Sequence, residues 1–312
     1  MRELDLAPER TPVPPTWPEP KHQTPGAKRL SPAWCAICGR PGASKRVLAG
    51  DEVEFRKCAC CGVVSRVPLL LPPELQEYFA ESYITTEASL EDSFGKRREE
   101  ILSLCAAAIE KRKTSGRILD VGCAGGYFLN HFFRADGWER FGVEPSRFAA
   151  RNAVKSGIEI YPGQVCTVAL PPGFFDVITL LDVLYYFTDP KSDLQTLRRS
   201  LQPNGMLVIE VPLGFTQLLR HHTGVGRALG GHPVSPLQRR HNYLFSAKSL
   251  VSLLERAGFE VQEMWSLPGV RQPSGLQHLV HRAYYSASRL VARVSNSRLI
   301  GGPNCLVIAR PR

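Results

Sequence analysis

The stretch Arg117-Ile118-Leu119-Asp120-Val121-Gly122-Cys123-Ala124-Gly125-Gly126 decides the fold of this chain, together with Phe141-Gly142-Val143-Glu144 further on. A short apolar run ends in an acid and leads into a turn of small residues, after which a helical segment begins at Tyr127. A second apolar run then ends in Glu144. This order predicts a strand, a turn, a helix and a second strand. Small residues let the backbone approach a ligand, and an acid after the second strand can accept hydrogen bonds from both ribose hydroxyls. The sequence therefore predicts a nucleoside-binding unit.

The spacing within the turn separates two classes of nucleoside-binding protein. Gly122-x-Ala124-x-Gly126 does not match the G-x-G-x-x-G pattern of dinucleotide folds, and Asp120 precedes the turn. The segment resembles motif I of class I S-adenosylmethionine-dependent methyltransferases, D-x-G-x-G-x-G, with Ala124 in place of the middle glycine. The resemblance implies that Asp120, Gly122, Ala124, Gly126 and Glu144 bind S-adenosylmethionine. The alternative is an ordinary α/β turn that binds no ligand.

A second segment extends the resemblance. Phe174 to Ile178 and Leu181 to Pro190 are similar to the "FDVI…DVLEH…DP" region of the same superfamily. The resemblance implies that Asp182 borders the methionine end of the cofactor. Tyr185 and Tyr186 stand where many relatives have Glu-His, so they are candidates for stacking on a substrate, with packing at a strand end as the alternative.

Two further site residues follow from the resemblance. The acid that reads adenine after the third strand in many relatives is not evident, and Gln164 is the candidate in its place. The segment from Arg239 to Ser246 resembles the "H-x-Y-F-S" stretch of methyltransferases fused to an N-terminal four-cysteine zinc module. His241, in a predicted loop, is a candidate general base. The alternative is a histidine that caps the next helix or bonds backbone groups.

Two cysteine knuckles precede this region. Cys35-x-x-Cys38-Gly39 and Cys58-x-x-Cys61-Gly62 are separated by 19 residues that contain two strand-like segments. This spacing predicts a zinc ribbon in which Cys35, Cys38, Cys58 and Cys61 hold a structural zinc ion. Cys60 is the spare thiol, because the choice of Cys61 makes Gly62 equivalent to Gly39. A redox motif is disfavoured because neither knuckle lies in a βαβ context.

The organisation of the chain follows from these motifs. We expect a disordered proline-rich tail over 1–33, the zinc ribbon over 34–67, a helical linker or lid over 68–116 and the cofactor-binding domain over 117–312. The predicted fold class is α/β, with a Rossmann-like seven-stranded sheet whose last strand the resemblance implies to be antiparallel. A basic amphipathic helix at about 276–297 is inserted before that strand. It is predicted to pack on the domain, with a substrate lid, a dimer surface or a peripheral membrane contact as alternatives.

Composition limits the partners and the compartment. The 312 residues carry a formal net charge of +10 with a pI of about 9.3, which favours anionic partners. No apolar run approaches the roughly 20 residues of a membrane span. Acids interrupt the N-terminal residues and no signal peptide is evident, so we expect a cytoplasmic location in which cysteines stay reduced.

The expected activity is methyl transfer from S-adenosylmethionine to a small molecule, with a saccharide or a natural-product intermediate favoured as the acceptor. One alternative is an RNA methyltransferase whose ribbon and basic surface hold nucleic acid, although no Asn-Pro-Pro-Tyr-like motif follows the fourth strand. Another is a zinc adaptor that binds the cofactor without catalysis. The acceptor atom and the oligomeric state stay open.

Overall fold

The computed structural model describes residues 34–41, 44–49, 53–79, 98–135, 137–214, 240–269 and 302–312, with short pieces at 279, 283–288 and 290–291. The predicted tail over 1–33 and most of the predicted helix over 276–297 lie outside the described residues. Within the described part of the chain, no helix combines the length and apolar character needed to cross a membrane.

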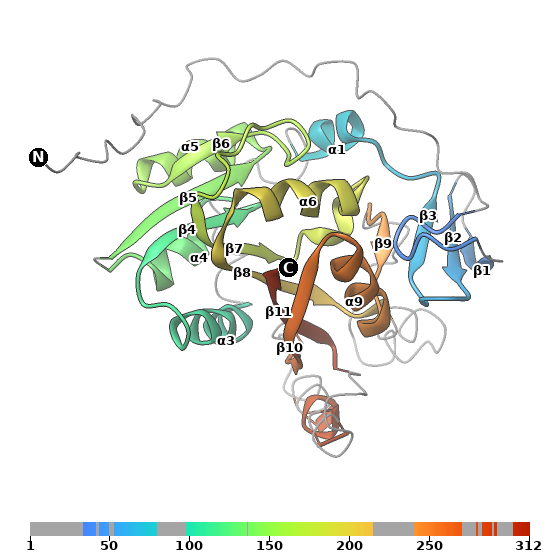
Figure 1. Cartoon of the computed structure of the whole chain (residues 1–312). Helices are drawn as coiled ribbons and strands as arrows, with labels where there is room; N and C mark the ends of the chain where they lie inside the picture. The colour runs from blue at the N-terminus through green and yellow to red at the C-terminus, as the bar shows by residue number, and fades with distance from the viewer. Residues whose placement is uncertain are drawn as a thin grey trace, which may run out of the picture.

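A seven-stranded sheet forms the centre of the molecule, in the order β10-β11-β8-β7-β4-β5-β6 (Figure 1). The strands are β4 (Gly116–Val121), β5 (Trp138–Glu144), β6 (Glu159–Pro162), β7 (Phe175–Leu181), β8 (Leu201–Pro212), β10 (Phe259–Leu267) and β11 (Asn304–Pro311). Strands β4 to β8 pair in parallel, whereas β11 is antiparallel to both of its neighbours. The predicted fold class and the reversed last strand are therefore confirmed.

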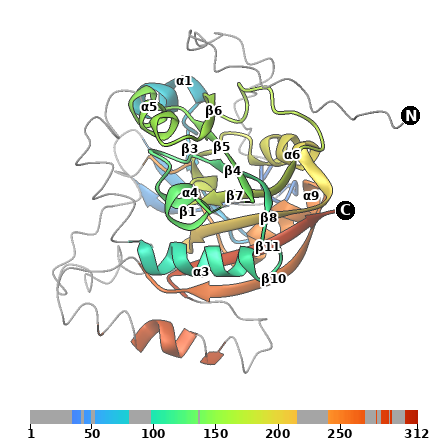
Figure 2. The same cartoon turned by 90° about the vertical axis from the view of Figure 1, so that its left-hand side faces the viewer.

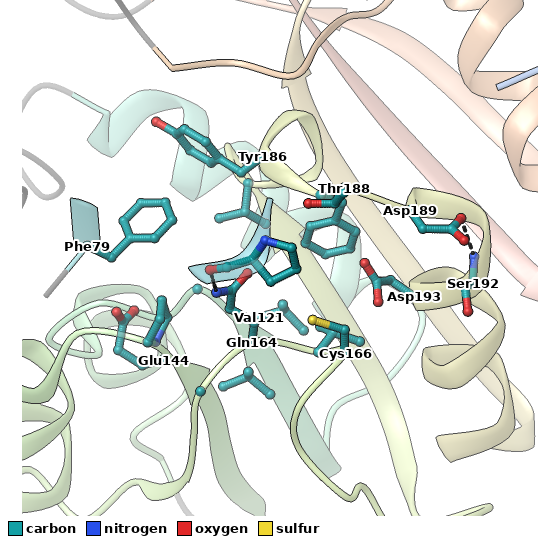
Figure 3. A pocket seen from close by; sticks show the side chains of 18 of the residues that line it. Phe79, Val121, Glu144, Gln164, Cys166, Tyr186, Thr188, Asp189, Ser192 and Asp193 are labelled. Carbon is teal, nitrogen blue, oxygen red and sulfur yellow. Dashed lines mark hydrogen bonds between the residues drawn. The ribbon is translucent and has the colours of Figure 1, made fainter. Parts of the chain in front are cut away.

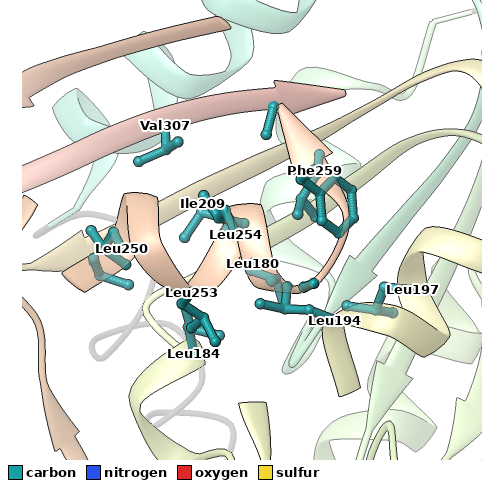
Figure 4. Packing of buried hydrophobic residues seen from close by; sticks show 14 of the residues in the cluster. Leu180, Leu184, Leu194, Leu197, Ile209, Leu250, Leu253, Leu254, Phe259 and Val307 are labelled. Carbon is teal, nitrogen blue, oxygen red and sulfur yellow. The ribbon is translucent and has the colours of Figure 1, made fainter. Parts of the chain in front are cut away.

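Helices cover both faces of this sheet (Figure 2). They are α3 (Glu99–Glu110), α4 (Tyr127–Phe132) and α5 (Arg147–Lys155) on one face, and α6 (Pro190–Ser200) and α9 (Ala247–Arg256) on the other. Adjacent strand residues alternate between the two cores, since Val208 packs with the first set and Ile209 with the second. Figure 4 shows leucines of α6 and α9 gathered against Ile209 and Val307. Both faces of the strands are thus buried, as expected for a parallel sheet.

The N-terminal cysteine module contains a second sheet, and one strand of this sheet comes from a distant part of the sequence. Its order is β1 (Ser44–Ala49), β2 (Glu54–Cys58), β3 (Val64–Val67) and β9 (Tyr243–Leu244). Val64 pairs with Leu244 and Ser65 with Tyr243. The segment after His241, which we expected to be a loop, therefore covers the edge of β3 that would otherwise expose unpaired backbone groups.

Asn242 joins the cysteine module to the larger sheet. Its side-chain oxygen accepts a hydrogen bond from the Leu70 N–H at 2.7 Å. Its side-chain nitrogen donates to the carbonyls of Leu70 at 3.0 Å and Tyr186 at 3.1 Å. Asn242 is fully buried, so each of these bonds replaces a hydrogen bond to water that is lost on folding.

Helix α9 fixes the module at both knuckles. The hydroxyl of Ser246, at the N-terminus of α9, donates to the carbonyl of Cys61 at 3.0 Å. Near the other end of the helix, the Arg256 guanidinium donates to the carbonyl of Ala36 at 3.0 Å. Because Ile37 and Cys61 also belong to the core that contains the α9 leucines, the module shares one hydrophobic core with the domain.

We predict that Asn242→Ala lowers the free energy of unfolding by about 2–4 kcal/mol, because it leaves several buried backbone groups without partners. Urea denaturation measures the change. Asn152→Ala is the matched control, because that half-buried amide in α5 donates only to the Phe148 carbonyl of its own helix. It should change stability by less than about 0.5 kcal/mol. Equal effects of the two variants would contradict the role of Asn242.

Candidate active site

A cavity of about 230 Å³ opens at the carboxyl ends of β4, β5, β6 and β7 (Figure 3). Its roof is α1 (Pro72–Tyr78), which is tied down at two points. Gln164 donates from its side-chain nitrogen to the Pro72 carbonyl at 2.8 Å, and Gln76 donates to the Pro145 carbonyl at 2.8 Å. Of the predicted site residues, those that line the cavity are Gly122, Ala124, Glu144, Gln164, Asp182 and Tyr186.

The turn after β4 depends on left-handed backbone. Gly122 has φ 75° and Gly126 has φ 82°. A Cβ on Gly122 would lie 2.5 Å from Val183 Cγ1, and one on Gly126 would lie 2.2 Å from Ile158 Cδ1. Ala124 also has positive φ, 49°, and pays a strain of about 1 kcal/mol for its methyl group. Gly126 lies outside the cavity wall and precedes α4, so the structure places it where it shapes the turn.

Glu144 connects the first two loops of the site. Its carboxylate accepts hydrogen bonds from the N–H of Ala124 at 2.8 Å and of Ser146 at 2.7 Å. The side chain is buried at the cavity wall, and burial raises its pKa to about 7 against the two bonds that favour ionisation. It can still accept bonds from a ligand, because each carboxylate oxygen has two lone pairs.

Asp120 lies beneath the turn and does not line the cavity. It accepts a hydrogen bond from the Thr179 hydroxyl at 2.6 Å. Burial raises the pKa of Asp120 to about 7. The Asp120 side chain thus lies between β4 and β7. A contact between Asp120 and the cofactor stays a prediction.

A buried ion cluster holds Asp182, which has positive φ, 66°. Arg98 lies 3.2 Å from the Asp182 carboxylate and also donates to Glu210 on β8. Burial raises the pKa of Glu210 to about 7, while Arg98 opposes that shift. Sequence reasoning did not single out Arg98 or Glu210, because nothing in their local pattern distinguishes them from a helix-terminal arginine and a strand residue.

The three predicted catalytic residues form one aromatic group, and only Tyr186 lines the cavity. The ring of Tyr185 packs on His241 with centroids 3.9 Å apart. Tyr186 meets His241 edge-on at 5.3 Å and meets Phe79 at 5.1 Å. His241 is only 2% exposed. The structure thus places His241 behind the tyrosines, and its role as a base stays a prediction.

The start of α6 supplies polar residues that sequence reasoning missed. Asp189, Ser192 and Asp193 all line the cavity. Asp189 caps the helix by accepting a hydrogen bond from the Ser192 N–H at 3.2 Å. Sequence alone assigns such residues to a helix N-terminus, where acids are common for the dipole and the cap.

The cavity is acidic although the whole chain is basic. Among the described residues, four carboxylates and no lysine, arginine or histidine line it; the acids are Glu144, Asp182, Asp189 and Asp193. Such a wall favours a ligand that carries positive charge and hydrogen-bond donors, and it opposes a pyrophosphate.

The four predicted metal-binding cysteines converge. The sulfur atoms of Cys35 and Cys61 lie 3.8 Å apart, and those of Cys38 and Cys58 lie 3.9 Å apart. All four sulfurs lie within 4.8 Å of one another. Tetrahedral zinc with Zn–S bonds of about 2.3 Å needs S–S separations of about 3.8 Å, so the donor set fits a zinc ion. Cys60 is outside this cluster and lines a hollow beside it, together with Cys58, Cys61 and three lysines, Lys45, Lys57 and Lys248.

Comparison with known proteins identifies relatives of the chain. Residues 94–264 match the family described as "Methyltransferase domain". The ubiquinone biosynthesis O-methyltransferase of Pectobacterium carotovorum is 33% identical over 96 residues, which cover 28% of this chain and 40% of that protein. The corresponding Pseudomonas putida (strain W619) protein is 33% identical over 98 residues, which cover 29% and 42%. The chain thus spans about two fifths of the length of these curated relatives.

A solved structure, a SAM-dependent methyltransferase of Leishmania major, superposes with a TM-score of 0.51 at 13% sequence identity. The match covers 76% of this chain and 82% of that chain. At this identity the likeness concerns the fold.

We predict that the protein without ligand loses stability as the pH rises from about 4 to about 7. Burial raises the folded-state pKa of Asp120 from 3.8 to about 7, so the folded state binds a proton that the unfolded state has released. Asp120→Asn should reduce the decrease in urea midpoint between about pH 5 and pH 8. It should not abolish the decrease, because the pKa values of Glu144 and Glu210 are raised in the same direction.

The control for this measurement is Glu139→Gln, which changes an exposed carboxylate on β5 and should keep the wild-type decrease. A wild-type decrease in the Asp120→Asn variant would show that Asp120 is ionised in the folded protein.

Proposed function

Because the chain belongs to the methyltransferase-domain family, we propose that it transfers a methyl group from S-adenosylmethionine to a small-molecule acceptor. The observation that carries the proposal is the acidic cavity at the carboxyl ends of the parallel strands. S-adenosylmethionine has a sulfonium and an ammonium group, with donors on its ribose and base. It therefore complements a wall of carboxylates, which a dinucleotide does not.

In this proposal, residues of the chain bind S-adenosylmethionine and orient it. Glu144 accepts hydrogen bonds from the ribose hydroxyls, and the turn at Gly122 gives the ligand close access to backbone. Asp182, held by Arg98, faces the methionine end. Bound S-adenosylmethionine would supply an activated methyl group, and displacement at that group requires in-line alignment and exclusion of water. The roof formed by α1 would contribute to the exclusion of water.

The acceptor is proposed to bind against the aromatic side of the cavity. Phe79 and Tyr186 line it there, with Tyr185 and His241 packed behind Tyr186. Aromatic walls suit the flat ring of a natural-product intermediate and the apolar face of a saccharide. The names of the bacterial relatives, which refer to ubiquinone biosynthesis, favour a natural-product intermediate.

We also propose that Cys35, Cys38, Cys58 and Cys61 bind a structural zinc ion. Four thiolates complete a tetrahedral shell and leave no position open for a substrate. Since α9 and Asn242 tie the module to the walls of the cavity, the metal would stabilise the site without taking part in the chemistry.

We predict that Glu144→Ala weakens binding of S-adenosylhomocysteine at least tenfold, because charge-assisted bonds to the ribose and the bond to Ala124 are both lost. Isothermal titration calorimetry measures the affinity. Glu139→Ala changes an exposed acid on the same strand and should bind as the wild type does. Unchanged affinity in Glu144→Ala would place the ribose elsewhere.

For the metal, we predict that the purified protein contains one equivalent of zinc, measured by elemental analysis. Cys61→Ser should lose that zinc and unfold at a lower temperature, because a structural site contributes on the order of 10 kcal/mol to its module. Cys60→Ser, one residue away and outside the cluster, should keep both zinc and stability. Loss of zinc in the Cys60 variant but not in the Cys61 variant would overturn the ligand assignment.

A further inference from the structure

Asp193 is a buried acid that faces the cavity. It lies in the first turn of α6, is 8% exposed, and lines the same cavity as Glu144. In Figure 3 its carboxylate points into the cavity beside Cys166. Within the described ranges, no hydrogen-bond donor contacts this carboxylate, whereas buried carboxylates normally have partners. A ligand donor in the cavity would satisfy it.

Asp193 reaches the cavity from α6, which follows β7, and lies beside Cys166 of the segment that follows β6. Glu144 ends β5, Asp182 follows β7, and the segment from Gly163 to Cys166 follows β6 at the opposite side of β5. The two side chains are neighbours in Figure 3, and in agreement with this, burial and the Asp193 carboxylate raise the pKa of Cys166 to about 12. If the ribose lies on Glu144 and the methionine end near Asp182, the base lies on the β6 side, where Asp193 is.

Two other polar side chains in this part of the cavity, Gln164 and Asp189, already have partners. Gln164 donates its side-chain N–H to the Pro72 carbonyl of the roof. Asp189 accepts the bond that caps α6. Asp193 therefore differs from both, because its carboxylate is not used by the described protein.

We propose that Asp193 accepts a hydrogen bond from the exocyclic amino group of the adenine base and so makes the cavity specific for adenine. The inference rests on the proposed binding of S-adenosylmethionine. Asp193 on α6 would then recognise the adenine, a role for which Gln164 is the candidate in the segment after β6. Adenine presents an amino donor at this position, whereas hypoxanthine presents a carbonyl oxygen that a carboxylate repels.

Isothermal titration calorimetry with S-adenosylhomocysteine and S-inosylhomocysteine tests the proposal. The wild type should prefer S-adenosylhomocysteine by about tenfold to a hundredfold, as expected for one charge-assisted bond. Asp193→Asn is nearly isosteric and can turn an N–H toward the hypoxanthine oxygen. It should bind S-adenosylhomocysteine at least tenfold more weakly and lose or invert the preference. Glu255→Gln, an exposed acid-to-amide change on α9, should keep the wild-type preference.

The possible results separate this inference from the proposed function. If the wild type binds neither ligand, the proposed function fails. If it binds both ligands equally, the proposed function stands and the inference fails, whether or not the variant folds. The inference also fails if folded Asp193→Asn, checked by thermal denaturation, keeps the wild-type preference while Gln164→Ala loses it, because Gln164 would then read the base.

Discussion

The hydrogen bonds that Glu144 accepts from the Ala124 and Ser146 N–H groups are the constraint on which the site depends. They join the loop after β4 to the loop after β5, so the left-handed turn and the acid at the second strand are positioned together. Burying a carboxylate is costly, and two backbone donors offset only part of that cost, because burial still raises the pKa of Glu144 to about 7. Further donors from a ligand would favour the ionised form. A ligand with hydroxyl donors would therefore complement Glu144.

The cysteine module supports the same cavity from behind. Asn242 follows His241 and precedes β9, so one short segment supplies an aromatic partner for Tyr185, a polar link to Leu70 and the fourth strand of the ribbon sheet. The Tyr186 carbonyl receives one of the Asn242 bonds while the Tyr186 ring lines the cavity. A conformational change in the cysteine module would therefore be transmitted to Tyr186, in the aromatic wall, through Asn242. The module, the linker and the domain consequently share one core and one set of hydrogen bonds.

Sequence predicted the parts of this structure that local pattern determines. Short apolar runs that alternate with helical segments predicted the seven-stranded sheet, and two C-x-x-C-G knuckles predicted the four converging sulfurs. It did not predict β9, because a two-residue strand is defined by its partner and β3 is far away in the sequence. It also missed Arg98 and Asp193, since a helix-terminal charge is usual for solvated helices. Only the folded structure distinguishes these residues: Arg98 by its two acidic partners, and Asp193 by the cavity, whose shape depends on loops from four strands.

The charge of the cavity differs from the charge of the whole chain, and this difference limits the class of ligand more closely than the glycine-turn motif at Gly122 to Gly126 does. A net charge of +10 suggests anionic partners, yet the described cavity wall has four carboxylates and no cationic side chain. A dinucleotide pyrophosphate would meet Asp182 and Asp193 without a compensating cation, because Arg98 is already paired with two acids. In the proposed function a sulfonium nucleoside instead brings its positive charge to Asp182, while its neutral hydroxyl and amino donors meet Glu144 and Asp193, whose carboxyl pKa values burial has raised. Binding would then favour ionised acids and expel protons from the site. A net positive charge of the whole chain and a negatively charged cavity are thus compatible, because a ligand in the cavity responds to the charges that line it.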